Sequence, residues 1–372
     1  MPARKVPEMR AALLAAPGKP LEITDLEIQE PGPGEVKLRM AASGICRSDL
    51  SVTTGVLKSP CPVVLGHEGA GVVEALGEGV TELALGDRVV VSLSPACGDC
   101  IFCKEGAPNR CVQMVPGMIG STMLDGTTRL SRGSEPVYQL CGVASFAEQA
   151  VVCARSCYVV DEEVPLERAC LIGCGVLTGA GTVFNSPDIG PGKSLAVIGC
   201  GGVGLAAIQA ARIEGVSQII AIDIDPAKLE LARELGAHHA LDGREELRKP
   251  IRKLTGLGVH VAIEAIGSVQ TLEAAWEMLR PGGLEIAVGM PRAGEKIAIR
   301  AGGLFLEKRL AGATYGGCDP RRDIPKLLQL VVSGEFRLDE LVSDELPLDR
   351  AQEALEALAA GRGARQVIVH SH

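Results

Sequence analysis

Four cysteines in a short segment that contains Gly, Pro and Lys have the spacing of a metal site. In CGDCIFCKEGAPNRC they follow the pattern C-x2-C-x2-C-x7-C. Four thiolates this close can complete a tetrahedral zinc shell with no position left for substrate, which is typical of a structural zinc. An iron–sulfur run begins with the same spacing but continues x3-C-P, and this segment does not. We predict a structural zinc lobe over residues 93–113, with these ligands: Cys97, Cys100, Cys103 and Cys111.

A second set of possible metal ligands is spread along the chain. His67 lies in GHEGAGVVEALGEGV beside Glu68, and the chain also contains Cys46 in GICRSD and Cys174 in GCG. Two thiolates and one imidazole can hold zinc with one position open for water or substrate, which is the arrangement of a catalytic zinc. The alternative is a histidine whose hydrogen bonds are satisfied in the core or at the surface. Distance along the sequence does not decide between them.

A glycine-rich loop follows an apolar strand and begins a helix. Its residues are Gly199, Gly201, Gly202, Val203 and Gly204. Glycines in this context let the backbone approach a pyrophosphate, and Asp223 at the end of the next strand can hold the adenosine ribose. A carboxylate there repels a 2′-phosphate and Ile224 offers no arginine, so the pattern favours NAD over NADP. The alternatives are a turn without a ligand and another nucleotide ligand such as S-adenosylmethionine.

The composition narrows the classes of protein. The chain has 372 residues, 47% hydrophobic and only 2% aromatic, so we expect two domains with aliphatic cores. A net charge of -9 without a basic run argues against nucleic acid as a partner. We find no apolar stretch of the ~20 residues that a membrane span requires, and the N-terminal AALLAA is too short for a signal peptide. We therefore expect a cytoplasmic protein whose thirteen cysteines serve metal binding and burial rather than disulfides.

The pattern of elements changes once along the chain. Residues 6–160 contain short β-type runs broken by Gly and Pro, which indicates an irregular, mostly β region. From residue 178 strands alternate with helices, which indicates a parallel sheet covered by helices on both faces. After residue 315 we expect two helices and a closing strand, RQVIVH.

Taken together, these motifs resemble those of the zinc-containing medium-chain alcohol dehydrogenases, and the likeness covers essentially the whole chain. The resemblance implies an α/β fold in which a GroES-like, mostly-β catalytic domain is combined with a Rossmann coenzyme domain built on a doubly wound parallel sheet. The implied boundaries are 1–177 for the catalytic domain, 178–317 for the Rossmann NAD-binding domain and 318–372 for a return to the catalytic domain.

The resemblance also implies roles for individual residues. Cys46, His67 and Cys174 would bind the catalytic zinc, with Glu68 as a carboxylate that ligates it transiently and Asp49 as the residue that orients His67. Contacts to the cofactor are implied as well. They would come from Arg47, Thr178, Lys228, Val288, Met290 and Arg365. For the charged residues and the threonine, the alternative is a solvated surface charge or a capping hydroxyl.

Ser48 and Ser51 concern the path of the proton. By resemblance, Ser48 takes the alcohol proton and passes it to the nicotinamide ribose. A histidine in well-known family members then relays it to solvent, and Ser51 stands in its place. A hydroxyl has no pKa near neutrality. We therefore expect the last step to run through Ser51 and water, or directly to solvent.

The expected function is reversible hydride transfer between a primary alcohol and NAD+, with two zinc ions per subunit. Leu57, Leu93, Leu140 and Met290 fall where the family lines its pocket, and these aliphatic residues favour medium-chain, branched or benzylic alcohols. One alternative is a dehydrogenase of S-(hydroxymethyl)glutathione, although CVQMVPG lacks an arginine for the carboxylate of the thiol. Another is a catalytically silent binding protein. We expect a homodimer or homotetramer with small-molecule partners only.

Overall fold

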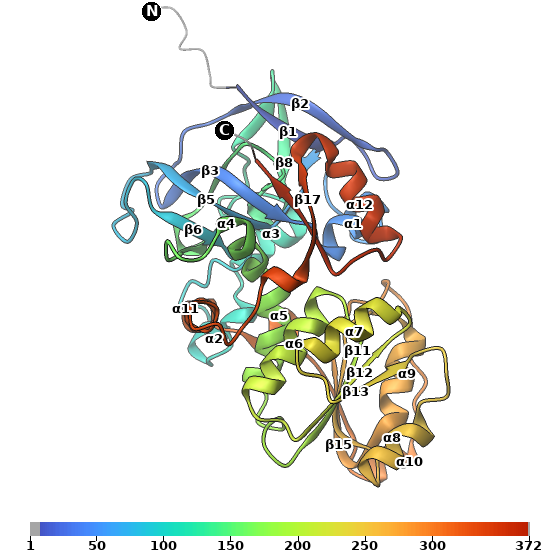
Figure 1. The fold of residues 1–372 in the computed structure, drawn as a ribbon. Helices are drawn as coiled ribbons and strands as arrows, with labels where there is room; N and C mark the ends of the chain where they lie inside the picture. Colours follow the sequence, from blue (N-terminus) through green and yellow to red (C-terminus); the bar gives the residue numbers. More distant parts are fainter. Residues whose placement is uncertain (1–7, 371–372) are drawn as a thin grey trace, which may run out of the picture. The chain divides into compact units, whose positions relative to one another are not determined.

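The structure, a computed structural model, describes residues 8–370 and separates into two compact units (Figure 1). The first unit comprises Met1–Cys174, Asp319–Ser333 and Val342–His372, and the second Gly175–Cys318 and Gly334–Leu341. The expected boundaries at 177 and 318 lie within three residues of these, but the return segment is interrupted. Residues 334–341 pack with the second unit because Gln209 Nε2 donates to the carbonyl of Arg337 at 2.9 Å.

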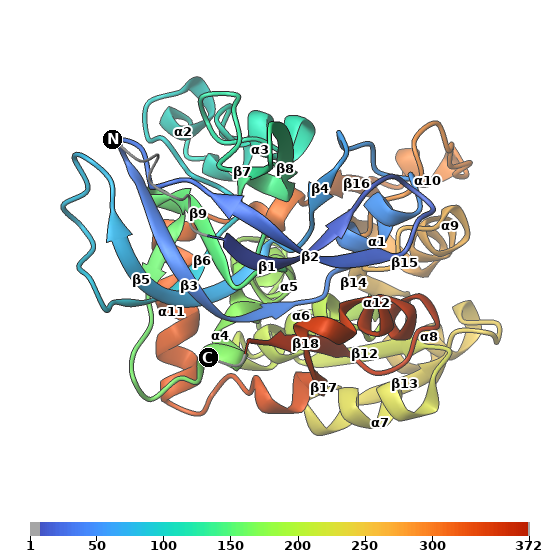
Figure 2. The ribbon, with the colours of Figure 1, turned by 90° about the horizontal axis from the view of Figure 1, so that it is seen from above.

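The first unit is built on a closed barrel and a larger sheet (Figure 2). The barrel runs in the order β1-β2-β7-β8-β4, and the sheet in the order β10-β6-β5-β3-β18-β17 with β9 added to β3. Its strands are β1 (Glu8–Leu14), β2 (Leu21–Ile28), β3 (Glu35–Gly44), β4 (Val63–Val64), β5 (Glu68–Leu76), β6 (Arg88–Val91), β7 (Leu130–Arg132), β8 (Glu135–Gln139), β9 (Gln149–Cys153), β10 (Cys157–Val159), β17 (Val342–Pro347) and β18 (Arg365–Val369). The strand β18 lies between β3 and β17 and pairs antiparallel with Ala42–Gly44, the residues shortly before Cys46.

The first unit also contains helices, some beside the metal-ligand residues and two in the segments of the first unit that follow residue 318. They are α1 (Arg47–Thr53), α2 (Ile101–Lys104), α3 (Met114–Gly120), α4 (Leu166–Ala169), α11 (Pro320–Val332) and α12 (Ala351–Ala359). Alternating strand residues bury two aliphatic clusters, and in the barrel cluster Phe146 is buried while Tyr138 packs against it partly buried. The scarcity of aromatic residues therefore does correspond to an aliphatic core.

The second unit is a six-stranded parallel sheet in the order β13-β12-β11-β14-β15-β16. Its strands are β11 (Ser194–Ile198), β12 (Gln218–Asp223), β13 (His239–Asp242), β14 (Val259–Glu264), β15 (Leu279–Ala287) and β16 (Arg309–Gly312). Its helices are α5 (Gly175–Phe184), α6 (Gly202–Ile213), α7 (Pro226–Glu234), α8 (Arg248–Thr255), α9 (Val269–Met278) and α10 (Gly302–Phe305). In chain order the strands read 3-2-1-4-5-6, the Rossmann order. The expected fold class is confirmed.

Helices on both faces of this sheet bury its strands (Figure 1). Residues of β11, β12 and β14 pack with Ile251 of α8 and Trp276 of α9 in one apolar cluster. Among the described residues, no single helix is both long and apolar enough to cross a membrane; only the bent pair Leu166–Gly173 and Gly175–Phe184 reaches that length and composition together.

Candidate active site

Asp49 organises the first group of metal-ligating side chains. It lies in the first turn of α1, is fully buried, and accepts the backbone N–H of Cys46 through Oδ2 at 3.0 Å. Its other oxygen accepts the N–H of Gly66 at 2.9 Å and lies 3.2 Å from Nδ1 of His67. Gly66 has a φ of 88°, and a Cβ there would meet Phe146. One carboxylate therefore fixes both the cysteine before α1 and the histidine before β5.

The ligand atoms of Cys46, His67, Glu68 and Cys174 lie within 4.8 Å of one another. Nε2 of His67 is buried and has no hydrogen-bond partner among the residues that the structure describes. A buried polar atom without a partner is rare in proteins. With Nδ1 held by Asp49, Nε2 is directed to the cluster, so these residues fit a metal ion that accepts two sulfurs and one imidazole nitrogen.

The side chains of this cluster shift one another's pKa values. The hydrogen bond from the Cys174 thiol lowers the pKa of Cys46 well below its ordinary value, against the effect of burial. The same pair raises the pKa of Cys174. Burial alone would lower the pKa of His67, but Asp49 and Cys46 raise it well above its ordinary value. Without a metal the group therefore retains protons that a bound cation displaces.

Glu68 and Arg365 form a buried ion pair at this cluster. The guanidinium Nη2 of Arg365, on β18, contacts Oε2 of Glu68 at the start of β5. Glu68 is fully buried and Arg365 is 5% exposed. Gly44 permits the pairing, because a Cβ at that position would overlap the Glu68 carboxylate. Sequence reasoning assigned Arg365 to a cofactor phosphate and did not anticipate this partner.

The two serines expected on the proton path lie on α1. Ser48 Oγ is 3.9 Å from the sulfur of Cys46, so it borders the metal-ligand cluster. Ser51 Oγ donates to the carbonyl of Arg47 at 2.9 Å, a bond within the helix. Arg47 itself is exposed. Because the Ser51 hydroxyl donates its hydrogen to the backbone, its oxygen can act towards other groups as a hydrogen-bond acceptor.

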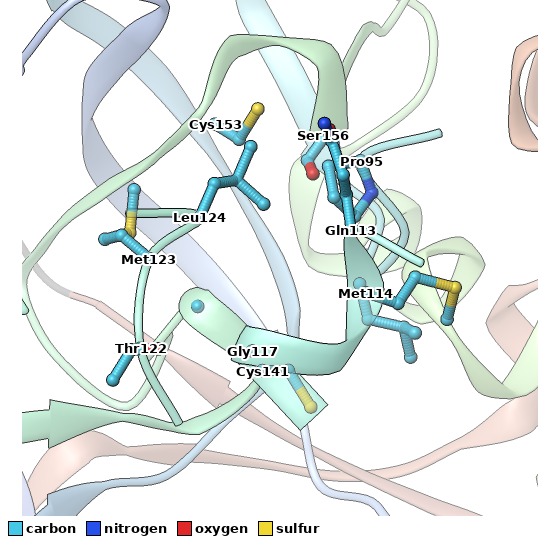
Figure 3. Close-up of a pocket in the computed structure, with 12 residues that line it drawn as sticks. Pro95, Gln113, Met114, Gly117, Thr122, Met123, Leu124, Cys141, Cys153 and Ser156 are labelled. Atoms are coloured by element: carbon cyan, nitrogen blue, oxygen red, sulfur yellow. The ribbon is translucent and has the colours of Figure 1, made fainter. Parts of the chain in front are cut away.

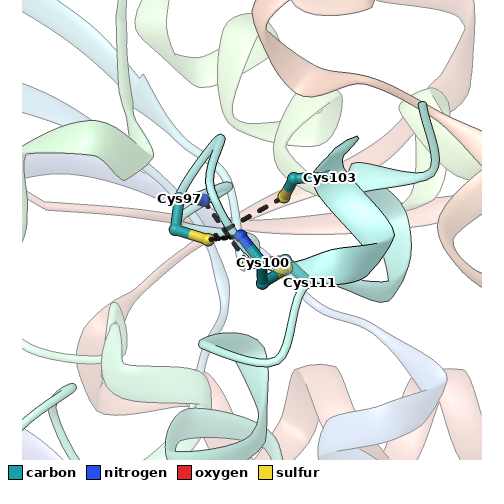
Figure 4. Close-up of side chains that lie close together, drawn as sticks. All are labelled: Cys97, Cys100, Cys103 and Cys111. Carbon is teal, nitrogen blue, oxygen red and sulfur yellow. Dashed lines mark hydrogen bonds between the residues drawn. The ribbon is translucent and has the colours of Figure 1, made fainter. Parts of the chain in front are cut away.

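The four cysteines of the predicted lobe converge (Figure 4). Sγ of Cys97 is 3.9 Å from Sγ of Cys103, and Sγ of Cys100 is 3.9 Å from that of Cys111. Tetrahedral zinc with Zn–S bonds of about 2.3 Å places its sulfurs about 3.8 Å apart. Backbone N–H groups also point at the sulfurs, and that of Val112 contributes most to lowering the pKa of Cys100 to about 6. The geometry fits a closed thiolate site.

The glycine loop in the second unit has the geometry that pyrophosphate binding needs. Gly199 has a φ of 94°, and Gly204 has no room for a Cβ because the carbonyl of Gly199 lies against it. Gly201, which precedes α6, faces open space. Asp223 accepts the N–H of Cys200 at 2.7 Å and that of Asp225 at 2.9 Å. The carboxylate is thus fixed beside the loop.

The other expected cofactor residues occupy separate positions. In the second unit, Thr178 lies on α5 and Lys228 on α7, while Val288 and Met290 follow β15. The N–H of Val288 donates to the carbonyl of Glu264 at 2.8 Å. Met290 is 57% exposed. Their cofactor contacts stay predictions.

Sequence reasoning missed Glu264, the last residue of β14. Its fully buried carboxylate accepts the N–H of Ile266 at 3.0 Å, the N–H of Gly267 at 2.8 Å and the hydroxyl of Thr271 at 2.7 Å. The available signal was a carboxylate directly after an apolar strand and three residues before a glycine, in AIEAIG.

A pocket in the first unit lies between α3 and the segment after it (Figure 3). Leu93, Met114, Met123 and Cys141 are among its lining residues. Its volume of about 20 Å³ is enough for about one water-sized probe. Of the residues expected in the substrate pocket, Leu140 is buried in the barrel core and Leu57 packs against it.

Comparisons with known proteins agree with this geometry. Residues 32–162 match the model of the alcohol dehydrogenase GroES-like domain and residues 202–333 that of zinc-binding dehydrogenases. An S-(hydroxymethyl)glutathione dehydrogenase of Synechocystis sp. is 36% identical over 364 residues, which are 96% of this chain and 99% of that protein.

Solved structures of similar fold include zinc-binding alcohol dehydrogenases as well. The structure of an alcohol dehydrogenase zinc-binding domain protein from Burkholderia ambifaria matches with a TM-score of 0.94 and 38% identity, covering 98% of this chain and all of that one. Benzyl alcohol dehydrogenase from Acinetobacter calcoaceticus matches with a TM-score of 0.93 and 33% identity at the same coverage.

Proposed function

This chain belongs to the family of zinc-containing medium-chain alcohol dehydrogenases, and we propose that it oxidises primary alcohols reversibly with NAD+ as hydride acceptor. As a member, it is an NAD(P)-dependent oxidoreductase acting on small alcohols or aldehydes. The observation that carries the proposal is the convergence of Cys46, His67 and Cys174 with a buried His67 Nε2 that lacks a partner in the described part of the chain.

Two zinc ions per subunit are proposed. Cys46, His67 and Cys174 would hold one, with Glu68 beside them, and the four cysteines of the lobe the other. When bound by the first set, zinc supplies a Lewis acid for the alcohol hydroxyl. Asp49 keeps Nδ1 of His67 protonated and its ring oriented, which makes Nε2 the ligand atom.

The remaining residues handle the proton. Ser48 borders the sulfur of Cys46 and is proposed to accept the alcohol proton and pass it to the ribose hydroxyl of the nicotinamide. Ser51 donates its hydrogen to the Arg47 carbonyl, so its oxygen can accept a hydrogen bond from a water but does not take up a proton at neutral pH. We propose that water, rather than a side chain, releases this proton.

NAD is proposed over NADP because of Asp223. Two backbone N–H groups hold its carboxylate, one of them from the glycine loop itself. A fixed negative charge at that position accepts ribose hydroxyls and repels a 2′-phosphate. Ile224, the next residue, is 62% exposed and supplies no compensating cation. Arg47, Thr178, Lys228, Val288, Met290 and Arg365 are proposed as further cofactor contacts.

Medium-chain, branched or benzylic primary alcohols are the proposed substrates. The basis is the aliphatic character of Leu57, Leu93, Leu140 and Met290, together with the likeness to a protein named benzyl alcohol dehydrogenase. Aliphatic side chains at these positions would offer no hydrogen bond to a second polar group of a substrate.

S-(hydroxymethyl)glutathione is the second candidate, because a relative that is 36% identical bears that activity in its name. The first unit argues against it locally. Val115, Met118 and Ile119 on α3 are exposed apolar side chains, and Arg155 donates to Gln113 at 2.5 Å. The segment CVQMVPG, residues 111–117, supplies no arginine for a carboxylate of glutathione, which disfavours this substrate.

We also propose a cytoplasmic homodimer or homotetramer. The edge strand β16 pairs only with β15 among the described residues and is exposed along its length. Phe305, just before it, is 89% exposed and Leu310 on it is 40% exposed. Exposed apolar residues beside a free strand edge are typical of subunit contacts. Light scattering of the purified protein measures the subunit number.

NADH formation across an alcohol panel tests the function. The panel contains benzyl alcohol, hexanol, isoamyl alcohol, ethanol, and formaldehyde with and without glutathione. We expect the highest kcat/KM for benzyl or medium-chain alcohols. A higher value for formaldehyde with glutathione would establish the second candidate. Absence of turnover in a protein that contains two zinc ions and binds NADH would establish the silent binding protein.

A further inference from the structure

The second unit contains a buried carboxylate that, unlike Glu264, has no hydrogen-bond partner among the described residues. Glu285, on β15, is 0% exposed, and neither Oε1 nor Oε2 has a partner within the described residues. An ionised carboxylate without hydrogen bonds is strongly unfavourable in a protein interior. The group therefore requires an explanation that the proposed function does not supply.

Glu285 shares a sheet face with Glu264. In the parallel pairing of β14 with β15, Ala262 lies opposite Glu285 and Glu264 lies opposite Ala287. Residues opposite each other in a parallel pair point to the same face, and those two apart along a strand do as well. The two glutamates are thus diagonal neighbours on the face that α9 covers, a spacing that long side chains can bridge.

Glu264 has a clear structural task as a hydrogen-bond acceptor. It accepts three donors, from Ile266, Gly267 and Thr271, and so holds the loop between β14 and α9. That loop contacts the dinucleotide-binding glycines, because a Cβ on Gly199 would lie 2.7 Å from Cγ1 of Ile266. The charge on Glu264 thereby positions a wall of the glycine loop.

Few other charged groups act on Glu285. Besides Glu264, the charged residue in the described part of the chain that affects it is Lys308, just before β16, and the ammonium of Lys308 donates to the carbonyl of Trp276 at 2.8 Å. The carboxylates of α9 are directed elsewhere, Glu273 to the N–H of Ala298 and Glu277 to Arg300. Glu264 is therefore the main charged neighbour.

We propose that Glu285 is protonated at neutral pH, so that the pair carries one negative charge, and that Glu285 is a positioning residue for the coenzyme loop. When Glu285 loses its proton to solvent, two buried negative charges share one sheet face. Their repulsion displaces Glu264 from its donors and loosens the loop beside the glycines. Coenzyme affinity should then fall with rising pH.

The direction of titration agrees with the geometry. Burial, and then the charge of Glu264, raise the pKa of Glu285 to about 8, while Lys308 opposes them. The neutral form of Glu285 therefore predominates at pH 7. Its ionisation near pH 8 lies within the pH range in which coenzyme binding can be measured. This inference rests on the proposed coenzyme site, so the test must separate the two.

Binding of ADP-ribose to the full-length zinc-loaded protein, measured by calorimetry between pH 6.5 and 9.5, provides that test. ADP-ribose carries the adenosine and pyrophosphate but no nicotinamide, so the zinc site contributes little to its pH dependence. The variants are Glu285→Gln, which is isosteric and neutral, and Glu285→Met, which removes every polar atom in case a buried amide impairs folding. Glu277→Gln, a partly exposed carboxylate on α9, is the matched control.

For the wild type and E277Q we expect the Kd to rise about threefold or more from pH 7 to pH 9, with a limit of about tenfold per pH unit for one proton. Binding near pH 8.5 should take up a fraction of a proton in these two proteins. For E285Q and E285M we expect a nearly constant Kd and no proton uptake. A rise in Kd that persists in both Glu285 variants would overturn the inference, whereas no ADP-ribose binding at any pH would overturn the coenzyme site itself.

Discussion

Oδ1 of Asp49 accepts the backbone N–H of Gly66 at 2.9 Å and also lies 3.2 Å from Nδ1 of His67. One oxygen therefore fixes both the backbone that carries the histidine and the ring itself. Because the other oxygen holds the N–H of Cys46, two proposed zinc ligands from separate segments depend on one buried side chain.

Asp49→Asn should weaken zinc binding at the catalytic cluster by about 10- to 100-fold, the usual cost of losing a partner that orients a ligand. An asparagine amide cannot satisfy three donors that now meet a carboxylate. Zinc retention against a chelator measures the effect, with one zinc per chain expected to leave first. Asp87→Asn, which alters a carboxylate that accepts the N–H of Ala84, should retain both zinc ions. Equal retention in the two variants would contradict the role of Asp49.

Ser51→His should introduce an additional ionisation near pH 6.5 into the pH profile of kcat for alcohol oxidation, because imidazole titrates there and a hydroxyl does not. Ser51→Ala, which removes only the hydroxyl bonded to the Arg47 carbonyl, should follow the wild-type profile closely. If S51H and S51A both overlay the wild type, position 51 takes no part in proton release.

Asp223→Asn should raise the ratio of kcat/KM for NADP+ to that for NAD+ by about tenfold or more, because the substitution removes the charge that repels a 2′-phosphate. Asp225→Asn is the matched control, since its carboxylate caps α7 through the N–H of Ala227. Steady-state kinetics with both coenzymes give the ratio. A similar change in both variants would assign the preference to general charge rather than to Asp223.

The stability of the wild type should fall as pH rises from about 5 to about 8. The pKa of Glu285 is raised to about 8 in the folded protein, so over this range the folded state keeps a proton that the unfolded state has lost. One such proton gives a slope of at most about 1.4 kcal/mol per pH unit. Denaturant unfolding at fixed pH values should show a shallower decline in E285Q. Parallel declines in the wild type and E285Q would show that Glu285 does not titrate there.

The sequence alone predicted those parts of the site whose residues lie close together along the chain. The four thiols lie within fifteen residues of one another, so their convergence on one metal could be predicted from spacing, and the glycine loop carries its own backbone requirements. The convergence of Cys46, His67 and Cys174 was different, because it followed from a family resemblance rather than from spacing. Only the folded chain brings β5, α1 and the segment before Cys174 together.

Pairings between distant residues could not be predicted. Arg365 was expected at a phosphate, yet β18 lies against β3 and brings it to Glu68. Glu264 and Glu285 become neighbours only through the register of β14 with β15. The short strands β13 and β16 were not anticipated either, because four residues carry too little periodicity for assignment.

Zinc content and NADH formation from benzyl alcohol, measured on the same samples, test the central claim most directly. We predict two zinc ions and turnover in the wild type. We predict one zinc ion and no turnover in His67→Ala, with folding and ADP-ribose binding retained. Turnover in H67A samples that contain a single zinc ion would contradict a catalytic zinc at Cys46, His67 and Cys174.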